Sequence, residues 1–283
     1  MSKQKTRLLF FDIDGTLWDW KDTVPDSARN AIRSARANGC LTFLNSGRSR
    51  GYIRNAELLD IGFDGIVSGD GTMIELPAPG KDSCSLRWRE NRVCLFSEIP
   101  PEQARRLADL LEAHGVRAIF EGVDHLYIDL APFGDDPYIN HVAEGMGEAL
   151  RTVSGHRDCL RVCKIACDMR LAHDREAFFR KMDEEYDPLI HNSDVVEFVP
   201  KGYSKGTGLL EVCRLLSRDP ADTVVFGDGV NDLPMFRVAG FSVAMGSGNP
   251  VIHGEADLVT AGLWEDGIAL ALSRLGLDRK SVV

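Results

Sequence analysis

The chain has 283 residues, of which 44% are hydrophobic, and it carries a formal net charge of −10. This length allows one large domain or two ordinary ones with a sizeable core, and the acidic balance argues against a nucleic-acid-binding protein that works through a general basic surface. No run approaches the roughly 18 apolar residues of a membrane span, and the basic start leads into too short an apolar run for a signal peptide. We therefore expect a cytoplasmic protein that binds neither nucleic acid nor membrane.

The seven cysteines are an odd number and lie scattered along the chain, which indicates reduced, buried thiols rather than a disulfide framework. Cys159, Cys163 and Cys167 recur at every fourth residue, and this leaves a metal site open. The spacing is not that of a zinc CxxC pair, and on a strand these residues would share one face. We favour structural cysteines.

The first expected strand runs to Phe11 and ends in two carboxylates and a glycine, Asp12-Ile13-Asp14-Gly15. Residues two apart on an extended strand point to the same side, so Asp12 and Asp14 can face one pocket. Two like charges this close are explained by a bound divalent cation, a shared proton, or separate roles as nucleophile and acid/base. The alternative is a simple Asp-Gly turn after a strand.

Strands and helices alternate over the next part of the chain. We expect a helix over 25–37, a strand over 41–44, a helix over 49–60 and a strand over 65–67. The two strands end in polar groups, Ser46-Gly47-Arg48 and Gly69-Asp70-Gly71. The alternation predicts an α/β fold with a doubly wound parallel sheet, in which ligands collect at the carboxyl ends of the strands.

The segment Pro77-Ala78-Pro79-Gly80 is a candidate boundary. Beyond it we expect strands over 83–88, 116–120, 125–130, 160–167 and 189–199, and helices over 101–114, 137–150 and 175–186. Strands that follow one another directly suggest an α+β domain with an antiparallel sheet. We therefore assign residues 81–190 to an inserted domain and residues 1–80 and 191–283 to a discontinuous core.

Strand–helix alternation resumes after Pro200. We expect a helix over 205–216 with Ser204 as its N-cap, a strand over 223–226, a short helix over 233–238, a strand over 241–244 and a last helix over 264–275. The strand over 223–226 ends in the polar loop Gly227-Asp228-Gly229-Val230-Asn231-Asp232. A third strand of the predicted core thus ends in carboxylates.

The polar side chains at the strand ends suit a metal and a phosphate: Asp12, Asp14, Ser46, Lys205, Asp228, Asn231 and Asp232. Hard oxygen ligands without His or Cys favour Mg²⁺, while a hydroxyl and an ammonium suit a phosphoryl group. A carboxylate cannot readily attack a phosphate dianion because like charges repel. Mg²⁺ and Lys205 would offset that repulsion.

These residues resemble the four motifs of the haloacid dehalogenase superfamily, in order and over nearly the whole chain: Asp12-Ile13-Asp14-Gly15-Thr16-Leu17, Ser46-Gly47-Arg48, Gly202-Tyr203-Ser204-Lys205-Gly206 and Gly227-Asp228-Gly229-Val230-Asn231-Asp232. The insert is similar to the larger α/β cap of the subclass IIB (Cof-like) phosphatases. The resemblance implies a Rossmann-like core and an inserted cap that determines substrate specificity.

The resemblance also implies residue roles. Asp12 would be the nucleophile that forms an aspartyl-phosphate, and Asp14 would protonate the leaving group and then activate water. Asp12, the backbone carbonyl of Asp14, Asp228 and Asp232 would hold Mg²⁺. The phosphate-binding group would comprise Ser46, Gly47, Lys205 and Asn231, with Asn231 also orienting the acidic loop.

Three further residues are candidate substrate contacts, each with an alternative. Arg48 could touch the substrate phosphate or be a solvated or packing side chain at a helix start. Asp70 stands where relatives often carry Asn and could alter the polarity near the substrate, although we favour a turn residue. Lys164 could face the active site or be an exposed edge-strand lysine that blocks aggregation.

We predict a Mg²⁺-dependent phosphohydrolase that cleaves a small phosphate monoester, such as a sugar phosphate or a related metabolite. One alternative is a hexose-phosphate phosphomutase on the same core, and another is a non-catalytic binding or regulatory protein. The oligomeric state, monomer or homodimer, stays open.

Overall fold

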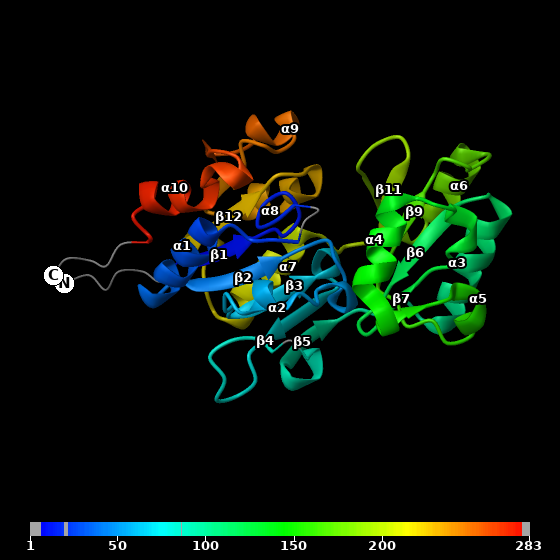
Figure 1. Ribbon diagram of the computed structural model, residues 1–283, viewed down its shortest axis with the longest axis horizontal. Helices are drawn as coiled ribbons and strands as arrows, with labels where there is room; N and C mark the ends of the chain where they lie inside the picture. Colours follow the sequence, from blue (N-terminus) through cyan, green and yellow to red (C-terminus); the bar gives the residue numbers. More distant parts are fainter. Residues whose placement is uncertain (1–6, 20–21, 86, 279–283) are drawn as a thin grey trace. The chain divides into compact units, whose positions relative to one another are not determined.

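The computed structural model describes residues 7–19, 22–85 and 87–278 (Figure 1). Its contacts divide the chain into two compact units. The core unit comprises Met1–Gly47, Asn55–Leu95 and Ser204–Val283, and the inserted unit comprises Arg48–Arg54 and Phe96–Tyr203. These bounds differ from the expected insert of residues 81–190, and a role of the inserted unit in substrate specificity stays a prediction.

The core unit is built on an eight-stranded sheet in the order β14-β13-β12-β1-β2-β3-β4-β5. The strands are β1 (Leu8–Phe11), β2 (Leu41–Asn45), β3 (Gly65–Ser68), β4 (Met73–Leu76), β5 (Arg92–Phe96), β12 (Thr223–Gly227), β13 (Phe241–Ala244) and β14 (Leu258–Val259). From β14 to β3 every pairing is parallel, and β4 is antiparallel to β3. The expected parallel α/β core is confirmed.

Helices cover both faces of this sheet: α1 (Asp26–Ala37), α2 (Ala56–Leu59), α7 (Lys205–Leu215), α8 (Leu233–Val238), α9 (Pro250–His253) and α10 (Gly267–Arg274). Phe10 of β1 packs in one cluster with Leu209 of α7 and Met235 of α8. Its neighbours along β1 point to the opposite face because side chains alternate along a strand. All four β1 side chains are fully buried, as in a sheet covered on both sides.

The inserted unit has its own six-stranded sheet in the order β10-β11-β9-β6-β7-β8. Its strands are β6 (Arg117–Glu121), β7 (Leu126–Tyr127), β8 (Leu150–Arg151), β9 (Lys164–Asp168), β10 (Tyr186–Ile190) and β11 (Val195–Pro200). The pairings are antiparallel except that of β7 with β8. The expected α+β character of the insert is confirmed.

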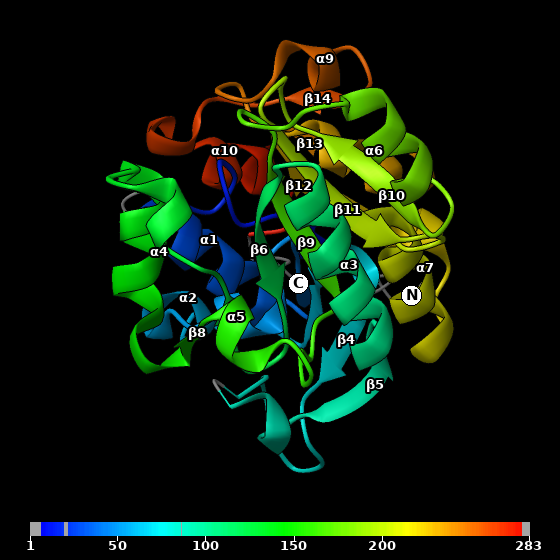
Figure 2. The same ribbon diagram turned by 90° about the vertical axis from the view of Figure 1, so that its right-hand side faces the viewer.

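Helices pack on both faces of the inserted sheet: α3 (Pro101–Ala113), α4 (Pro137–Met146), α5 (Val153–His156) and α6 (Arg175–Met182). Phe120 of β6 packs with Leu111 of α3 and Phe178 of α6, and Figure 2 shows α3 in front of β6 and β9. The preceding residue, Ile119, packs with Ile139 of α4. The two clusters therefore lie on opposite faces of the sheet.

Several expected elements differ from the structure. In the expected strand over 83–88, none of the described residues, 83–85 and 87–88, belongs to a strand, and β5 begins only at Arg92. The expected helix over 49–60 is a 3₁₀ turn and the short α2, because Asn55 accepts a hydrogen bond from Leu58 N and caps a new helix start. The expected strand over 189–199 is a hairpin, since Asn192 Oδ1 accepts hydrogen bonds from the backbone N–H groups of Asp194 and Val195.

Short 3₁₀ helices connect the other elements: Arg50–Tyr52, Gly69–Gly71, Trp88–Glu90, Ala131–Phe133, Gly147–Ala149, Pro220–Asp222, Val230–Asp232 and Leu263–Glu265. Within the described ranges, the helices are all too short or too polar to cross a membrane.

Candidate active site

The first part of the site is the loop that follows β1. Asp12 N donates to Phe226 O at 3.0 Å, so the pairing with β12 continues one residue beyond the strand. The chain then turns, because the backbone N–H groups of Leu17 and Trp18 both donate to Ile13 O. Asp12 is buried, whereas Asp14 is exposed and accepts a hydrogen bond from the Trp18 indole at 3.1 Å. The strand alternation expected to align Asp12 with Asp14 therefore stops before Asp14.

Gly15 lets this loop approach the end of β12. Its φ of +81° favours glycine, and a Cβ at this position would overlap the carboxylate of Asp228. The next residue, Thr16, donates its hydroxyl to Asp228 Oδ1 at 3.0 Å and is fully buried. Sequence reasoning assigned no role to Thr16, although it belongs to the first motif.

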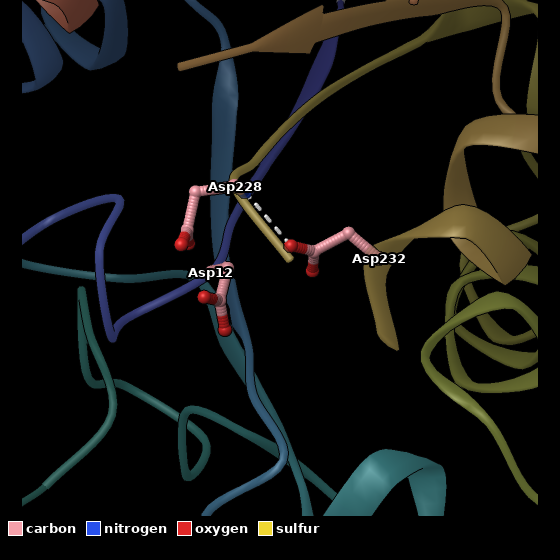
Figure 3. Close-up of side chains that lie close together, drawn as sticks. All are labelled: Asp12, Asp228 and Asp232. Atoms are coloured by element: carbon pink, nitrogen blue, oxygen red, sulfur yellow. Dashed lines mark hydrogen bonds between the residues drawn. The ribbon is translucent and has the colours of Figure 1, made fainter. Parts of the chain in front are cut away.

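The acidic loop after β12 folds around Asp232. One oxygen of this carboxylate accepts hydrogen bonds from the backbone N–H groups of Asp228 and Gly229, both at 2.9 Å. A side chain at Gly227 would overlap the Asp232 carboxylate. The loop thus positions Asp228 beside Asp12, as Figure 3 shows.

Three carboxylates gather at these strand ends. Asp12, Asp228 and Asp232 each offer one oxygen, and these oxygens lie within 4.8 Å of one another (Figure 3). In the described parts of the chain, no other group of three or more His, Cys, Asp or Glu side chains could share an ion. Cys159, Cys163 and Cys167 therefore form no such group there. Carboxylates expected from two separate segments, the loop after β1 and the loop after β12, therefore come together.

Lys205 lies inside this cluster. It is the first residue of α7, which begins at Ser204 with a capping box made with Thr207. The Lys205 ammonium is fully buried and donates to Asp12 Oδ1 at 2.7 Å and to Asp232 Oδ1 at 2.6 Å. A single lysine thus bridges two of the three carboxylates.

The electrostatics of the cluster suit a cation. Burial raises the pKa of Asp12 well above its ordinary value, and Asp232 and Asp228 raise it further against the opposing effect of Lys205. Burial and the neighbouring Asp232 raise the pKa of Asp228 to about 6. The Lys205 charge therefore does not fully offset the burial and mutual repulsion of these carboxylates, which favours an added cation. An all-oxygen donor set fits a hard divalent ion such as Mg²⁺.

The ends of β2 and β3 lie near the same acidic loop. Ser46 is buried, its N–H donates to Val67 O at 2.9 Å, and its carbonyl accepts from Asp70 N at 3.1 Å. A Cβ on Gly47 would lie 3.2 Å from Asp70 Oδ2 and 3.3 Å from Asn231 Nδ2. The structure therefore brings together Ser46, Gly47, Asp70 and Asn231.

Arg48 and Lys164 belong to the inserted unit. The Arg48 guanidinium lies 4.2 Å from the ring centroid of Tyr52. Lys164 is buried, 2.5 Å from Glu197 Oε2 and 4.0 Å from Glu121 Oε1. Its strand β9 lies between β11 and β6, so the alternative of an exposed edge-strand lysine is wrong. A substrate contact by Arg48 or Lys164 stays a prediction.

The sequence and the fold both match known proteins. The profile of haloacid dehalogenase-like hydrolases matches residues 9–272. YkrA of Bacillus subtilis (strain 168), named as a candidate phosphatase, is 30% identical over 96% of this chain and 98% of its own. YitU of the same organism, named as a 5-amino-6-(5-phospho-D-ribitylamino)uracil phosphatase, is 24% identical over 94% of this chain and 96% of its own. The solved structure of BT4131, a subclass IIB sugar phosphatase, superposes with a TM-score of 0.78 at 25% identity, covering 96% of this chain and all of that one. The chain therefore belongs to the haloacid dehalogenase-like hydrolases and is a phosphatase of that family.

Proposed function

We propose that the protein hydrolyses small phosphate monoesters through a covalent phosphate on Asp12, in a reaction that depends on Mg²⁺. The observation that carries this proposal is the buried Lys205 ammonium that bridges Asp12 and Asp232 beside Asp228. A carboxylate nucleophile facing a phosphate dianion needs positive charge at this place. Lys205 supplies one positive charge, and the three carboxylates are suited to hold a divalent cation that supplies more.

Asp12 is the proposed nucleophile. One of its oxygens forms a bond to phosphorus while the ester P–O bond breaks, and Asp14 gives a proton to the departing oxygen. Water then attacks phosphorus, Asp14 takes the proton of that water, and the bond between Asp12 and phosphorus breaks. The exposure of Asp14 supports its role in both proton transfers, because its carboxylate can contact the leaving group and water.

Asp12, Asp228, Asp232 and the backbone carbonyl of Asp14 would hold the metal. Mg²⁺ bound there would offset the charge of the carboxylates and of the phosphoryl group. Thr16 and the backbone N–H groups that bond the Asp228 and Asp232 carboxylates would keep these ligands in place. These contacts support the cation site independently of the comparisons.

The proposed phosphate site combines Lys205 with Ser46, Gly47 and Asn231. The Ser46 hydroxyl, the Gly47 backbone and the Asn231 amide are donors suited to phosphoryl oxygens. BT4131 is named as a sugar phosphatase, and the name of YitU specifies a phosphorylated ribityl compound. We infer a substrate of the same kind, a small polyhydroxylated metabolite with one phosphate ester.

The test is the release of inorganic phosphate from an aryl phosphate and from a panel of sugar phosphates, with Mg²⁺ and with chelator. We expect activity with Mg²⁺, loss with chelator, and loss in Asp12→Asn. The exposed Asp266 at the start of α10 provides a control, since Asp266→Asn removes the same charge outside the cluster. Full activity in Asp12→Asn or in chelator would refute the mechanism, and conversion of a hexose 1-phosphate to the 6-phosphate would identify a phosphomutase instead.

A further inference from the structure

Asp70 has an unusual backbone and an unusual environment for a turn residue. Its φ of 53° and ψ of 40° lie in the left-handed region, which disfavours residues that carry a Cβ. Its carboxylate is nevertheless buried, with only 1% of the residue exposed. Glycine would make this turn without strain and without burying a charge. The side chain must therefore matter for more than the turn.

The Asp70 carboxylate lies against the proposed phosphate loop. A Cβ on Gly47 would lie 3.2 Å and 3.3 Å from its two oxygens, and 3.3 Å from the Asn231 amide nitrogen. The Asp70 N–H donates to Ser46 O at 3.1 Å, which ties its backbone to the same loop. Gly47 thus carries no side chain where Asp70 and Asn231 approach it, and three proposed phosphate-binding groups adjoin one negative charge.

The Asp70 carboxylate also affects the pKa of Lys205. Burial alone would lower the pKa of Lys205, but the carboxylates of Asp12, Asp232 and Asp70, in that order, hold it above its ordinary value. Asp70 lies outside the three-carboxylate group that could share a metal ion. It is therefore a fourth carboxylate near this lysine, on the phosphate side of the cluster.

We propose that Asp70 weakens the retention of inorganic phosphate in the site and so favours release of the product. The inference rests on the proposed function. A phosphate dianion beside Gly47 and Lys205 meets the field of a buried carboxylate, and like charges repel strongly where water is excluded. The carboxylate also offsets part of the Lys205 charge that would otherwise hold the product.

The decisive variant is Asp70→Asn, which keeps the size of the side chain and the tolerance of the left-handed region but removes the charge. Binding of inorganic phosphate to the full-length, Mg²⁺-loaded protein is measured by calorimetry. Its inhibition constant against an aryl phosphate is measured in parallel. We expect the dissociation constant of inorganic phosphate and its inhibition constant each to fall at least about threefold. KM should also fall, and kcat should not rise. Asp70→Gly, which removes the charge and relieves the backbone, should shift phosphate binding in the same direction.

Asp266→Asn is the matched control, because Asp266 shares the left-handed backbone, with a φ of 62°, and is exposed. We expect wild-type phosphate binding in that variant. Unchanged or weaker phosphate binding in both folded Asp70 variants, as judged by Tm, would overturn the inference while leaving the proposed function intact. A wild-type protein that neither binds phosphate nor releases it from esters would overturn the proposed function, and this inference with it.

Discussion

Replacing Lys205 with methionine tests the electrostatic balance of the site most directly. The substitution keeps an unbranched side chain of similar volume and removes the ammonium that lies 2.7 Å from Asp12 and 2.6 Å from Asp232. Removing one partner of a buried ion pair costs about 3–5 kcal/mol, because the remaining charges stay buried without compensation. A loss of that size in the transition state corresponds to a fall in kcat of roughly a hundredfold to several thousandfold.

Two assays separate the effects of Lys205→Met on stability and catalysis. Urea unfolding is measured with chelator, so that no metal replaces the lost charge, and phosphate release is measured with Mg²⁺. Lys201→Met is the control, because Lys201 forms an exposed pair with Asp183 at 3.4 Å, and such pairs contribute about 0–1 kcal/mol. A kcat within tenfold of the wild type, or a stability loss no larger than that of Lys201→Met, would refute the reasoning.

Two other substitutions test the loop after β1 and a charged cluster of the inserted unit. Gly15→Ala should lower kcat by more than about 100-fold, because the loop must shift away from the carboxylate that a Cβ would strike. Gly80→Ala is its control, since Gly80 has a φ of +80° and nothing within 4 Å of the added Cβ. Near-equal kcat in these variants would contradict this account. In the inserted unit, a hydrogen bond from the Arg170 side chain lowers the pKa of Asp136. The stability that this pair contributes is therefore present above the unfolded pKa of about 3.9. It is lost as the pH falls through the lower pKa of the folded state. Unfolding measured from neutral pH down through this range should therefore show a smaller acid-induced loss in Arg170→Ala than in the wild type, and equal losses would contradict the assignment.

The sequence predicts the gathering of Asp12, Asp228 and Asp232 because all three follow buried strands. Strands that alternate with helices pair in parallel, so their carboxyl ends meet at one edge of the sheet. The position of Lys205 follows from the same rule only in part. Its helix start is readable from Ser204, but its contacts with Asp12 and Asp232 also depend on how α7 packs against the sheet.

Long-range contacts explain what the sequence does not reveal. The position of Lys164 depends on the strand order β11-β9-β6, which no local pattern encodes. Its partners Glu121 and Glu197 are distant in the sequence and become neighbours only when the sheet forms. The turn after β1 is local, and the sequence offers it as an alternative to a strand that continues to Asp14; the period-two alternation does not hold past Phe11, where the strand ends.

The sequence assigns the segment Arg48–Arg54 to the core, within residues 1–80, but the structure does not. It directly follows the proposed phosphate-binding residues, yet it belongs to the inserted unit. The Ser49 N–H donates to Glu121 Oε2 at 3.0 Å, and the Gly51 N–H donates to Gly122 O at 3.0 Å. The Tyr52 side chain also packs against the cluster formed by β6, β7 and α4.

The second motif is therefore divided between two structural units at the bond between Gly47 and Arg48. Ser46 is fixed by the parallel pairing of the core sheet, whereas Arg48 is fixed by contacts of its segment with the inserted sheet. Adjacent residues of one motif thus owe their positions to different sets of contacts. On the prediction that the inserted unit determines substrate specificity, we expect Arg48 to vary with the substrate and Ser46 to keep its contact with the phosphoryl group.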